Sequence, residues 1–353
     1  MRALVVGSVI GKRGSIGARY THIQKAMQPD ITVSRSTSLL GNRLFLSTIT
    51  GVVRSKLKSL KFRYLENVFR RIEYWCFYVD VVYSLRGRTV TFLWLRDPHP
   101  LIIKYYKKRG ATVVIDLAIM TQQHVREITP QVLKNDDFIF KIEQKGIELA
   151  DYIICPSSLM HKWLMKNYPK KQITLVNFGV NLTNRFAIQH KPRVAFIGVN
   201  SERKGVCDFL KIAELHTDIE FLTYGNGFKN LKKLHNLHHN GFCDQIEFNE
   251  FSILLLPTFM EGMSKAVLEA LCHGCLVVTT PQSGLTKDIP GVFICEAGNI
   301  NSINDALCQA LEKLNDLPFR VKATCANREY FSSSSYETRL KAFLNSIEKP
   351  SYD

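Results

Sequence analysis

"ILLLPTFMEGMSKAVLEALCHGCLVVTT", residues 253–280, contains a strand, a helix and a second strand in one stretch. An apolar run ends at Pro257, a helix-forming run begins near Ser264 and stops at Gly274, and another apolar run follows. Two strands joined through a helix run parallel, because the helix carries the chain back to the edge where the first strand began. The stretch therefore predicts a parallel sheet covered by helices.

The same alternation of strands and helices runs through most of the chain in two series. The first series occupies residues 1–185 and the second residues 192–330, with the polar stretch "NLTNRFAIQHKP" (181–192) as the linker. A chain of 353 residues is also longer than a single core usually supports. We expect an α/β fold of two Rossmann-like, doubly wound domains facing a cleft.

Composition and charge narrow the classes of partner. The 46% hydrophobic content indicates a globular chain, and no stretch reaches the length of a membrane span. Residues 1–190 carry 30 Lys and Arg against 12 Asp and Glu, whereas the remainder is nearly balanced within a net charge of +16. This asymmetry predicts that the N-terminal half faces a polyanion, either nucleic acid or an anionic membrane. We expect a cytoplasmic protein, free or bound at a membrane surface.

Two minor motifs invite a metal or redox interpretation. Cys272 and Cys275 form the one C-x-x-C pair among nine cysteines, and packed thiols at a helix end are favoured over redox chemistry or zinc. The cluster "LHNLHH" (234–239) has no acidic or thiolate partner at ligand spacing and is expected on a solvated helix face. No D-x-D pair follows a strand, so no metal is expected.

Two carboxylates flank the start of the helix in the opening stretch. Glu261 lies in the loop after the strand, and Glu269 lies in the second turn of the helix. The amides and the dipole at the helix start favour a phosphate between them, with help from Lys265. Because carboxylates accept hydrogen bonds from diols, a nucleoside diphosphate sugar fits this arrangement. The alternative is that both acids are simply solvated.

The motif "EGMSKAVLEA" resembles the Glu-x7-Glu signature of the retaining glycosyltransferases of family 4. Other stretches resemble the same family: "RVAFIGVNSERKGVCDFL" its phosphate-contacting loop, "FLTYGNG" its Gly-rich turn, and "RGSIGARYTHI" its N-terminal glycine loop. Two more stretches, "ADYIICPSSLMHKWL" and "ITLVNFGVN", resemble the end of the family's N-terminal domain. The resemblance implies the GT-B arrangement, with a helix in residues 331–353 that crosses back to the N-terminal domain.

The resemblance also assigns roles in donor binding. Glu261 is expected against the donor sugar, Glu269 at the ribose hydroxyls and Lys204 at the leaving diphosphate. The diphosphate would lie on the amides of Gly262, Met263, Ser264 and Lys265. The sequence departs from the family at Val199, where an Arg is usual; Arg203 is the available substitute, although adjacent side chains need not point the same way.

Two further residues come from the N-terminal half. Gly17, with Gly14, resembles the family loop that approaches the donor or acceptor, although a plain turn explains the pair equally well. His124 follows the "TVVID" strand and corresponds to a His that the family often places near the reacting sugar; a structural role is the alternative.

The run "RSKLKSLKFRYLENVFRRIEYW" (54–75) mixes Arg and Lys with aromatic and apolar residues. It predicts a surface helix that rests on anionic lipid, or else a solvated helix face. The family commonly meets lipid-linked acceptors, which favours the first interpretation.

The resemblance implies transfer of a sugar, with retention, from a UDP- or GDP-linked donor to a glycan or lipid-linked acceptor, as in polysaccharide or lipopolysaccharide synthesis. No other cofactor is expected. The protein would work in the cytoplasm at the inner membrane face. Two rivals stay open: an epimerase or phosphorylase on the same fold, and a basic nucleic-acid-binding protein without enzymatic activity.

Overall fold

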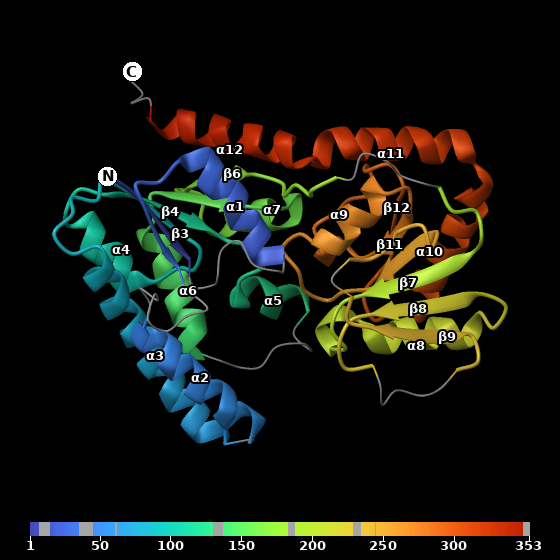
Figure 1. Cartoon of the computed structure of the whole chain (residues 1–353), viewed down its shortest axis with the longest axis horizontal. Helices are drawn as coiled ribbons and strands as arrows, with labels where there is room; N and C mark the ends of the chain where they lie inside the picture. The colour runs from blue at the N-terminus through green and yellow to red at the C-terminus, as the bar shows by residue number, and fades with distance from the viewer. Residues whose placement is uncertain are drawn as a thin grey trace.

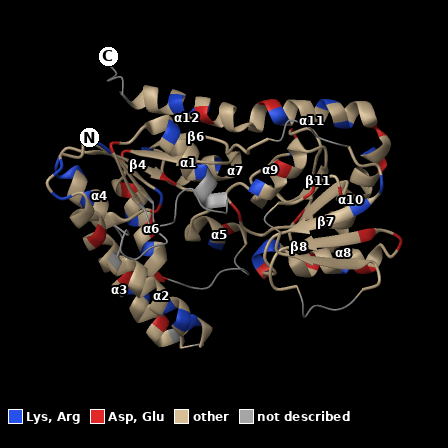
Figure 2. Ribbon diagram, in the orientation of Figure 1, with Lys and Arg blue, Asp and Glu red and all other residues tan. Residues whose placement is uncertain are grey.

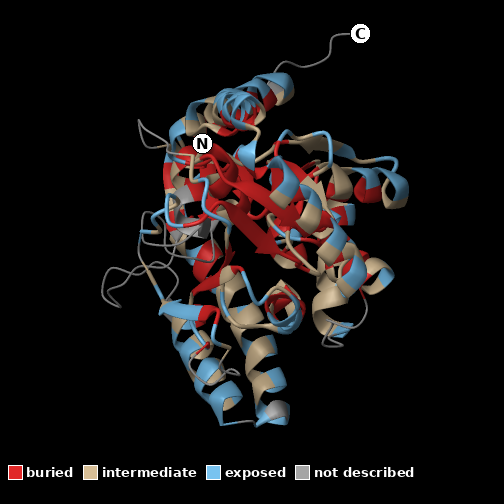
Figure 3. Cartoon of the chain, turned by 90° about the vertical axis from the view of Figure 1, so that its right-hand side faces the viewer, coloured by how far each residue is buried: buried red, intermediate tan, exposed pale blue. Residues whose placement is uncertain are grey.

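A computed structural model of the chain describes residues 1–6, 15–34, 45–60, 62–129, 137–182, 188–228, 234–243 and 245–348. Within these residues, two parallel sheets of six strands each organise the molecule (Figure 1). Buried residues concentrate in the sheets and on the helix faces that cover them (Figure 3). The expected α/β fold with two doubly wound units is confirmed.

The first sheet belongs to the N-terminal half and has the order β2-β1-β3-β4-β5-β6, with all neighbours parallel. Its strands are β1 (Arg2–Val6), β2 (Ile31–Ser34), β3 (Phe92–Leu95), β4 (Thr112–Asp116), β5 (Tyr152–Cys155) and β6 (Gln172–Leu175). The helices between them are α1 (Ser15–Met27), α2 (Phe45–Ser59), α3 (Arg63–Ser84), α4 (Pro100–Lys107), α5 (Gln122–Ile128), α6 (Asp137–Leu149) and α7 (Ser158–Asn167).

The second sheet has the order β12-β11-β10-β7-β8-β9 and is also parallel. Its strands are β7 (Arg193–Ile197), β8 (Glu220–Tyr224), β9 (Leu237–Gly241), β10 (Ile253–Leu256), β11 (Leu276–Thr279) and β12 (Val292–Ile294). Its helices are α8 (Val206–Leu215), α9 (Lys265–Cys272), α10 (Ile300–Glu312) and α11 (Leu317–Phe331). Short 3-10 turns are η2 (Glu202–Lys204), η3 (Pro281–Ser283) and η4 (Lys313–Asn315).

The prediction of a helix face for the His-rich cluster at 234–239 is wrong. Its second half lies in β9, which pairs with β8 at the edge of the sheet. Leu237 is buried while His238 and His239 are exposed, and the Nδ1 atom of His239 lies 2.8 Å from the Thr223 hydroxyl on β8. An edge strand exposes enough surface to accept polar side chains that a central strand would bury.

The single surface helix expected over residues 54–75 is also wrong, because the chain turns in the middle of that run. Helices α2 and α3 form an antiparallel hairpin that projects from the first sheet (Figure 1). The buried carboxylate of Asp80, near the end of α3, accepts hydrogen bonds from the amides of Leu46 (3.2 Å) and Ser47 (2.8 Å) at the start of α2. This contact satisfies amides that the helix itself leaves unpaired, and so fixes the register of the hairpin.

The chain passes between the two sheets twice, and the two passages lie side by side. The amide of Val180 donates to the carbonyl of Phe331 (2.8 Å), and the amide of Ser333 donates back to Val180 (3.0 Å). After this bridge, α12 (Ser333–Glu348) packs on α1, where the ring of His22 meets Glu337 at 2.8 Å. In Figure 1, α11 and α12 follow one another across both halves.

Three stretches of the expected organisation lie partly outside the described residues. They are the end of the first predicted strand (7–10), the part of the glycine loop that contains Gly14, and the middle of the predicted linker (183–187). The expected helix before β9 likewise falls largely on residues 229–233.

Gly205 connects the fold to the candidate site. It follows η2 with a φ of +73°, and a methyl group in its place would lie 2.0 Å from the carbonyl oxygen of Pro257 at the end of β10. Only glycine fits such an approach at this conformation. The segment with Arg203 and Lys204 is therefore held directly against the loop that carries Glu261.

We predict that Gly205→Ala strongly destabilises the protein, by about 3 kcal/mol or more, because it adds a backbone clash to the cost of the left-handed conformation. The matched control is Gly87→Ala, since Gly87 has a φ of +72° with no atom within 4 Å of the added methyl. This control should cost only about 1–2 kcal/mol. Urea unfolding measures the loss of stability in each of the two variants. Equal losses would contradict the backbone clash assigned to Gly205→Ala.

Candidate donor-binding and catalytic site

The loop between β10 and α9 forms the centre of the candidate site. The amide of Glu261 donates to the carbonyl of Gln282 (3.1 Å), and the amide of Ser264 donates to that of Ser283 (2.9 Å). The expectation that the Ser264 amide is free for a phosphate is therefore wrong. The carbonyl of Ser283, in the segment after β11, already accepts a hydrogen bond from that amide. The same contacts hold the Glu261 backbone in place.

Glu261 binds two cations through one carboxylate oxygen. Its Oε1 atom lies 2.6 Å from Nη1 of Arg203 and 2.5 Å from Nζ of Lys204. Nη1 of Arg203 also donates to the carbonyl of Met260 at 2.6 Å, and the carbonyl of Arg203 accepts from the Phe259 amide at 2.9 Å. These contacts bring together three of the residues that the sequence analysis selected.

The electrostatics of this cluster favour a second anion. The side chains of Glu261 and Lys204 are only 15% and 13% exposed. Burial alone would raise the pKa of Glu261, but the charges of Lys204 and Arg203 outweigh burial and lower that pKa. One carboxylate thus faces two cations in a partly dehydrated position, which leaves an excess of positive charge.

Glu269 lies in an ordinary helical ion pair. Nζ of Lys265 lies 2.7 Å from its Oε1 atom, one turn away on α9, and both side chains are partly exposed. The carboxylate therefore reaches solvent and can exchange Lys265 for a hydroxyl ligand. The predicted contacts of Glu269 with ribose, and those of Gly262 and Met263 with phosphate, stay predictions.

The N-terminal half touches this loop directly. A methyl group on Gly262 would lie 2.0 Å from the carbonyl oxygen of Ala118, in the segment after β4. The hydroxyl of Thr129 donates to the carbonyl of Phe259 (3.0 Å). The carboxyl ends of β4 and β10 therefore meet, which is the edge where ligands of parallel sheets bind.

His124 occupies a packed position on α5. Its side chain is 1% exposed, and its ring stacks on that of Trp163 with centroids 4.7 Å apart. Burial lowers the pKa of His124 to about 4, so the imidazole is neutral at pH 7. Among the described residues, no hydrogen bond or ion pair joins His124 to Glu261, Arg203 or Lys204, and its catalytic role stays a prediction.

Gly17 lies within the first turn of α1 and not in a loop. Its proposed approach to the donor or acceptor is therefore untested by the described backbone contacts, and it too stays a prediction.

The segment 281–284 belongs to the site and was missed. It supplies the carbonyls that hold the Glu261 loop, and a methyl group on Gly284 would lie 2.5 Å from the carbonyl oxygen of Gly262. The signal was available, because "PQSG" follows the strand next to β10 at the same carboxyl edge. Applying the strand-end rule to both neighbouring strands would have found it.

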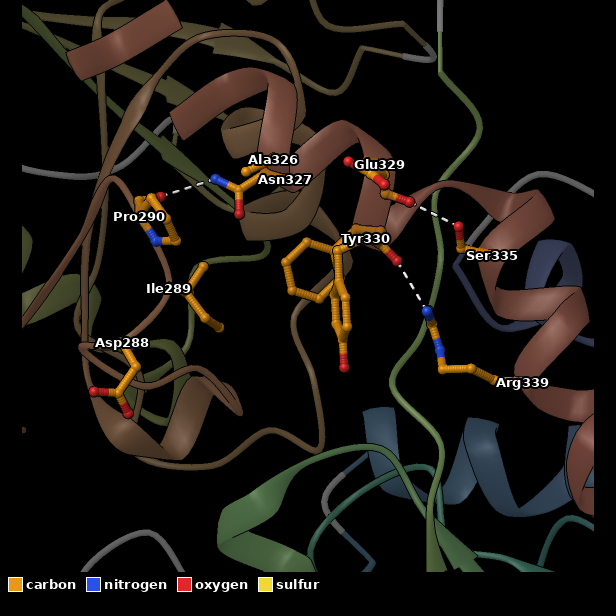
Figure 4. Close-up of a pocket in the computed structure, with 10 residues that line it drawn as sticks. Asp288, Ile289, Pro290, Ala326, Asn327, Glu329, Tyr330, Ser335 and Arg339 are labelled. Atoms are coloured by element: carbon orange, nitrogen blue, oxygen red, sulfur yellow. Dashed lines mark hydrogen bonds between the residues drawn. The ribbon is translucent and has the colours of Figure 1, made fainter. Parts of the chain in front are cut away.

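Other features lie away from this cluster. A cavity of about 530 Å³ opens beside the two chain passages, lined by Tyr330, Asn327 and Arg339 among others (Figure 4). Cys272 and Cys275 are buried thiols whose pKa burial raises to about 12, as expected for packed cysteines. Among the described residues, no helix is both long and apolar enough to cross a bilayer.

A family model described as glycosyl transferases group 1 matches residues 191–313. A Klebsiella pneumoniae protein, described as an uncharacterized 42.6 kDa protein in the cps region, is 26% identical over 151 residues. The aligned region is 40% of this chain and 37% of that protein, so the chain matches little more than a third of the relative's length.

Several solved structures resemble the whole chain, including the following two. Sucrose-phosphate synthase from Thermosynechococcus elongatus superposes with a TM-score of 0.76 at 12% identity, over 98% of each chain. Anabaena Alr3699/HepE, solved in complex with UDP, gives 0.68 at 12% identity, over 98% of this chain and 100% of its own. At such low identity these likenesses establish the fold. Residues 191–313 thus match the model of the glycosyl transferases group 1 family, and the two sheets have the GT-B fold.

Proposed function

We propose that this protein transfers a sugar from a nucleoside diphosphate donor to a glycan or lipid-linked acceptor, with retention of configuration. The observation that carries the proposal is the convergence of Arg203 and Lys204 on the carboxylate of Glu261. These residues lie within the part of the chain that the family model matches. The UDP complex of the similar HepE structure supports a nucleotide-linked donor.

In the donor complex, the diphosphate would replace Glu261 as the partner of the two cations. Arg203 would then take the place of the Arg that the family usually has at Val199. Its guanidinium is already held beside Lys204 by the carbonyl of Met260. The released carboxylate would turn to the hydroxyls of the donor sugar, and Glu269 would exchange Lys265 for the ribose diol.

The reaction we propose needs no enzymic base and no metal. The bond between the anomeric carbon and the leaving phosphate oxygen breaks, and the acceptor oxygen bonds to that carbon on the same face. The acceptor proton passes to the leaving phosphate. Arg203 and Lys204 stabilise the charge that develops on the diphosphate, a contribution that preorganised cations make without reorganisation.

The acceptor is proposed to belong to cell-envelope polysaccharide or lipopolysaccharide synthesis at the inner face of the membrane. The cps region of the Klebsiella relative supports a polysaccharide. The basic excess of residues 1–190 supports work at an anionic surface.

The first prediction for the proposed reaction concerns Glu261, Lys204 and Arg203. Glu261→Gln and Lys204→Ala should each lower donor turnover by about 100-fold or more, because each removes a charge that acts on the reacting groups. Arg203→Ala should raise the donor KM by about tenfold. Release of nucleoside diphosphate from the donor measures all three.

The matched control is Arg193→Ala. Arg193 is 31% exposed, close to the 33% of Arg203, and pairs with Glu220 at the opposite end of β7. Its turnover should stay within about twofold of wild type. An unchanged donor KM in Arg203→Ala would show that Arg203 does not replace the missing Arg.

The second prediction concerns pH. Because the pKa of His124 is about 4, this residue stays neutral from pH 6 to pH 9 and should add no inflection to the rate in that range. Wild type and His124→Gln should therefore give pH profiles of the same shape. An inflection near pH 6.5 that the variant lacks would mean that His124 titrates during turnover.

The third prediction identifies the donor. A panel of UDP-, GDP-, ADP- and CMP-sugars should raise the melting temperature for one base only, since a ligand at about 100 times its Kd stabilises by about 2.7 kcal/mol. Glu269→Gln should reduce that shift, whereas Glu148→Gln, in a comparable surface ion pair with Lys145, should not. A full shift in Glu269→Gln would contradict the ribose assignment.

A further inference from the structure

We infer that the α2–α3 hairpin is a docking element that lays one apolar face into the surface of an anionic bilayer. This inference deepens the membrane association proposed above, because it assigns the contact to one element and one face. Twelve of the twenty large apolar side chains that are exposed in the described part of the chain lie between Leu46 and Tyr83. Figure 3 shows the hairpin as largely exposed.

The exposed apolar residues of α3 form one continuous stripe. They recur at intervals of three or four residues, so they share one face of the helix. Their exposed fractions run from 37% to 71%. This stripe consists of Leu65, Val68, Ile72, Trp75, Val79 and Tyr83.

Helix α2 also exposes apolar side chains. Leu46, Ile49 and Val52 are spaced by three residues and are 42–54% exposed. Leu60 and Phe62, in the turn that joins the two helices, are 64% and 54% exposed. Exposed apolar side chains therefore lie on α2, on α3 and between the two helices.

The charges of the hairpin decide which partner fits this face. Its three acids are all engaged: Glu66 pairs with Arg70 (2.9 Å), Glu73 pairs with Arg54 (2.6 Å), and Asp80 is buried at the start of α2. Lys56, Lys58 and Arg71 are exposed. Figure 2 shows Lys and Arg on α2.

Among the described side chains of the hairpin, the exposed charges are therefore all cations. Each such cation near an anionic headgroup surface strengthens binding about fivefold. A second copy of this chain fits less well, because residues 45–84 carry seven Lys and Arg against three Asp and Glu, and two such hairpins repel.

The geometry of the contact is that of an interfacial helix. Neither α2 nor α3 is both long and apolar enough to span a bilayer. Apolar side chains on one face of α3, with exposed cations on the same hairpin, suit helices that lie in the plane of the headgroups. The long stem of Lys56, which shares a face of α2 with Ile49 and Val52 by helical spacing, can reach lipid phosphates while the stripe enters the apolar layer.

Tryptophan fluorescence tests this orientation directly. The chain has three Trp residues, of which Trp94 and Trp163 are buried and Trp75 is 57% exposed in the stripe. With vesicles of phosphatidylglycerol and phosphatidylcholine, the full chain should show a blue-shifted emission that brominated lipids quench. Trp75→Phe should abolish both changes while still sedimenting with the vesicles.

Vesicle sedimentation tests the two forces separately. Lys56→Ala with Lys58→Ala should weaken binding on the order of 20-fold, and Ile72→Ser with Val79→Ser about tenfold. The matched controls are Lys322→Ala with Lys341→Ala, and Leu215→Ser with Phe242→Ser, which remove exposed residues of the same kinds outside the hairpin. These controls should bind vesicles like wild type.

Three outcomes would overturn the inference. They are unchanged binding in the hairpin variants, equal binding to pure phosphatidylcholine vesicles, and a dimer in sedimentation velocity that the Ile72→Ser with Val79→Ser variant disrupts. The hairpin variants should keep the donor-induced rise in melting temperature. Loss of donor binding in wild type with intact vesicle binding would instead count against the proposed transfer reaction alone.

Discussion

The contact of one carboxylate with two cations is the interaction around which the candidate site is arranged. Glu261 can hold Arg203 and Lys204 only because the turn after β7 lies against the loop after β10. Without Glu261, two positive charges would face each other in a partly buried place, which is costly in the absence of another anion. The carboxylate thus keeps the two cations together, and in the proposed reaction a diphosphate would take its place.

Two close backbone approaches make this contact possible. Gly205 lets the cation-bearing turn meet Pro257, and Gly262 lets the same loop meet Ala118 of the N-terminal half. Each leaves no space for a side chain. The charged groups are therefore positioned by close backbone contacts between the segments that follow β4, β7 and β10. A further connection between the halves is the hydrogen-bonded bridge between Val180 and Ser332, where the two chain passages lie side by side.

Much of the fold could be predicted from sequence, since buried parallel strands and amphipathic helices have different hydrophobic periods. The wrong predictions for β9 and for the α2–α3 hairpin each have a physical cause. The edge strand β9 has exposed histidines and so lacks the apolar signal of the inner strands. No Gly or Pro separates α2 from α3 in the sequence, and only the structure shows that α2 ends at Ser59 and that α3 begins at Arg63.

The sequence by itself determined that Glu261 and Glu269 flank a helix start beyond a strand, because strand and helix periods and their breakers are local properties. It could not decide where consecutive side chains point, so the joint approach of Arg203 and Lys204 to one oxygen came only from the tertiary structure. The hydrogen bond from the Ser264 amide to Ser283, in the segment after β11, likewise came only from the tertiary structure. These contacts join residues from 19 positions apart, for Ser264 and Ser283, to 58 positions apart, for Arg203 and Glu261. Their geometry depends on how whole strands and turns pack.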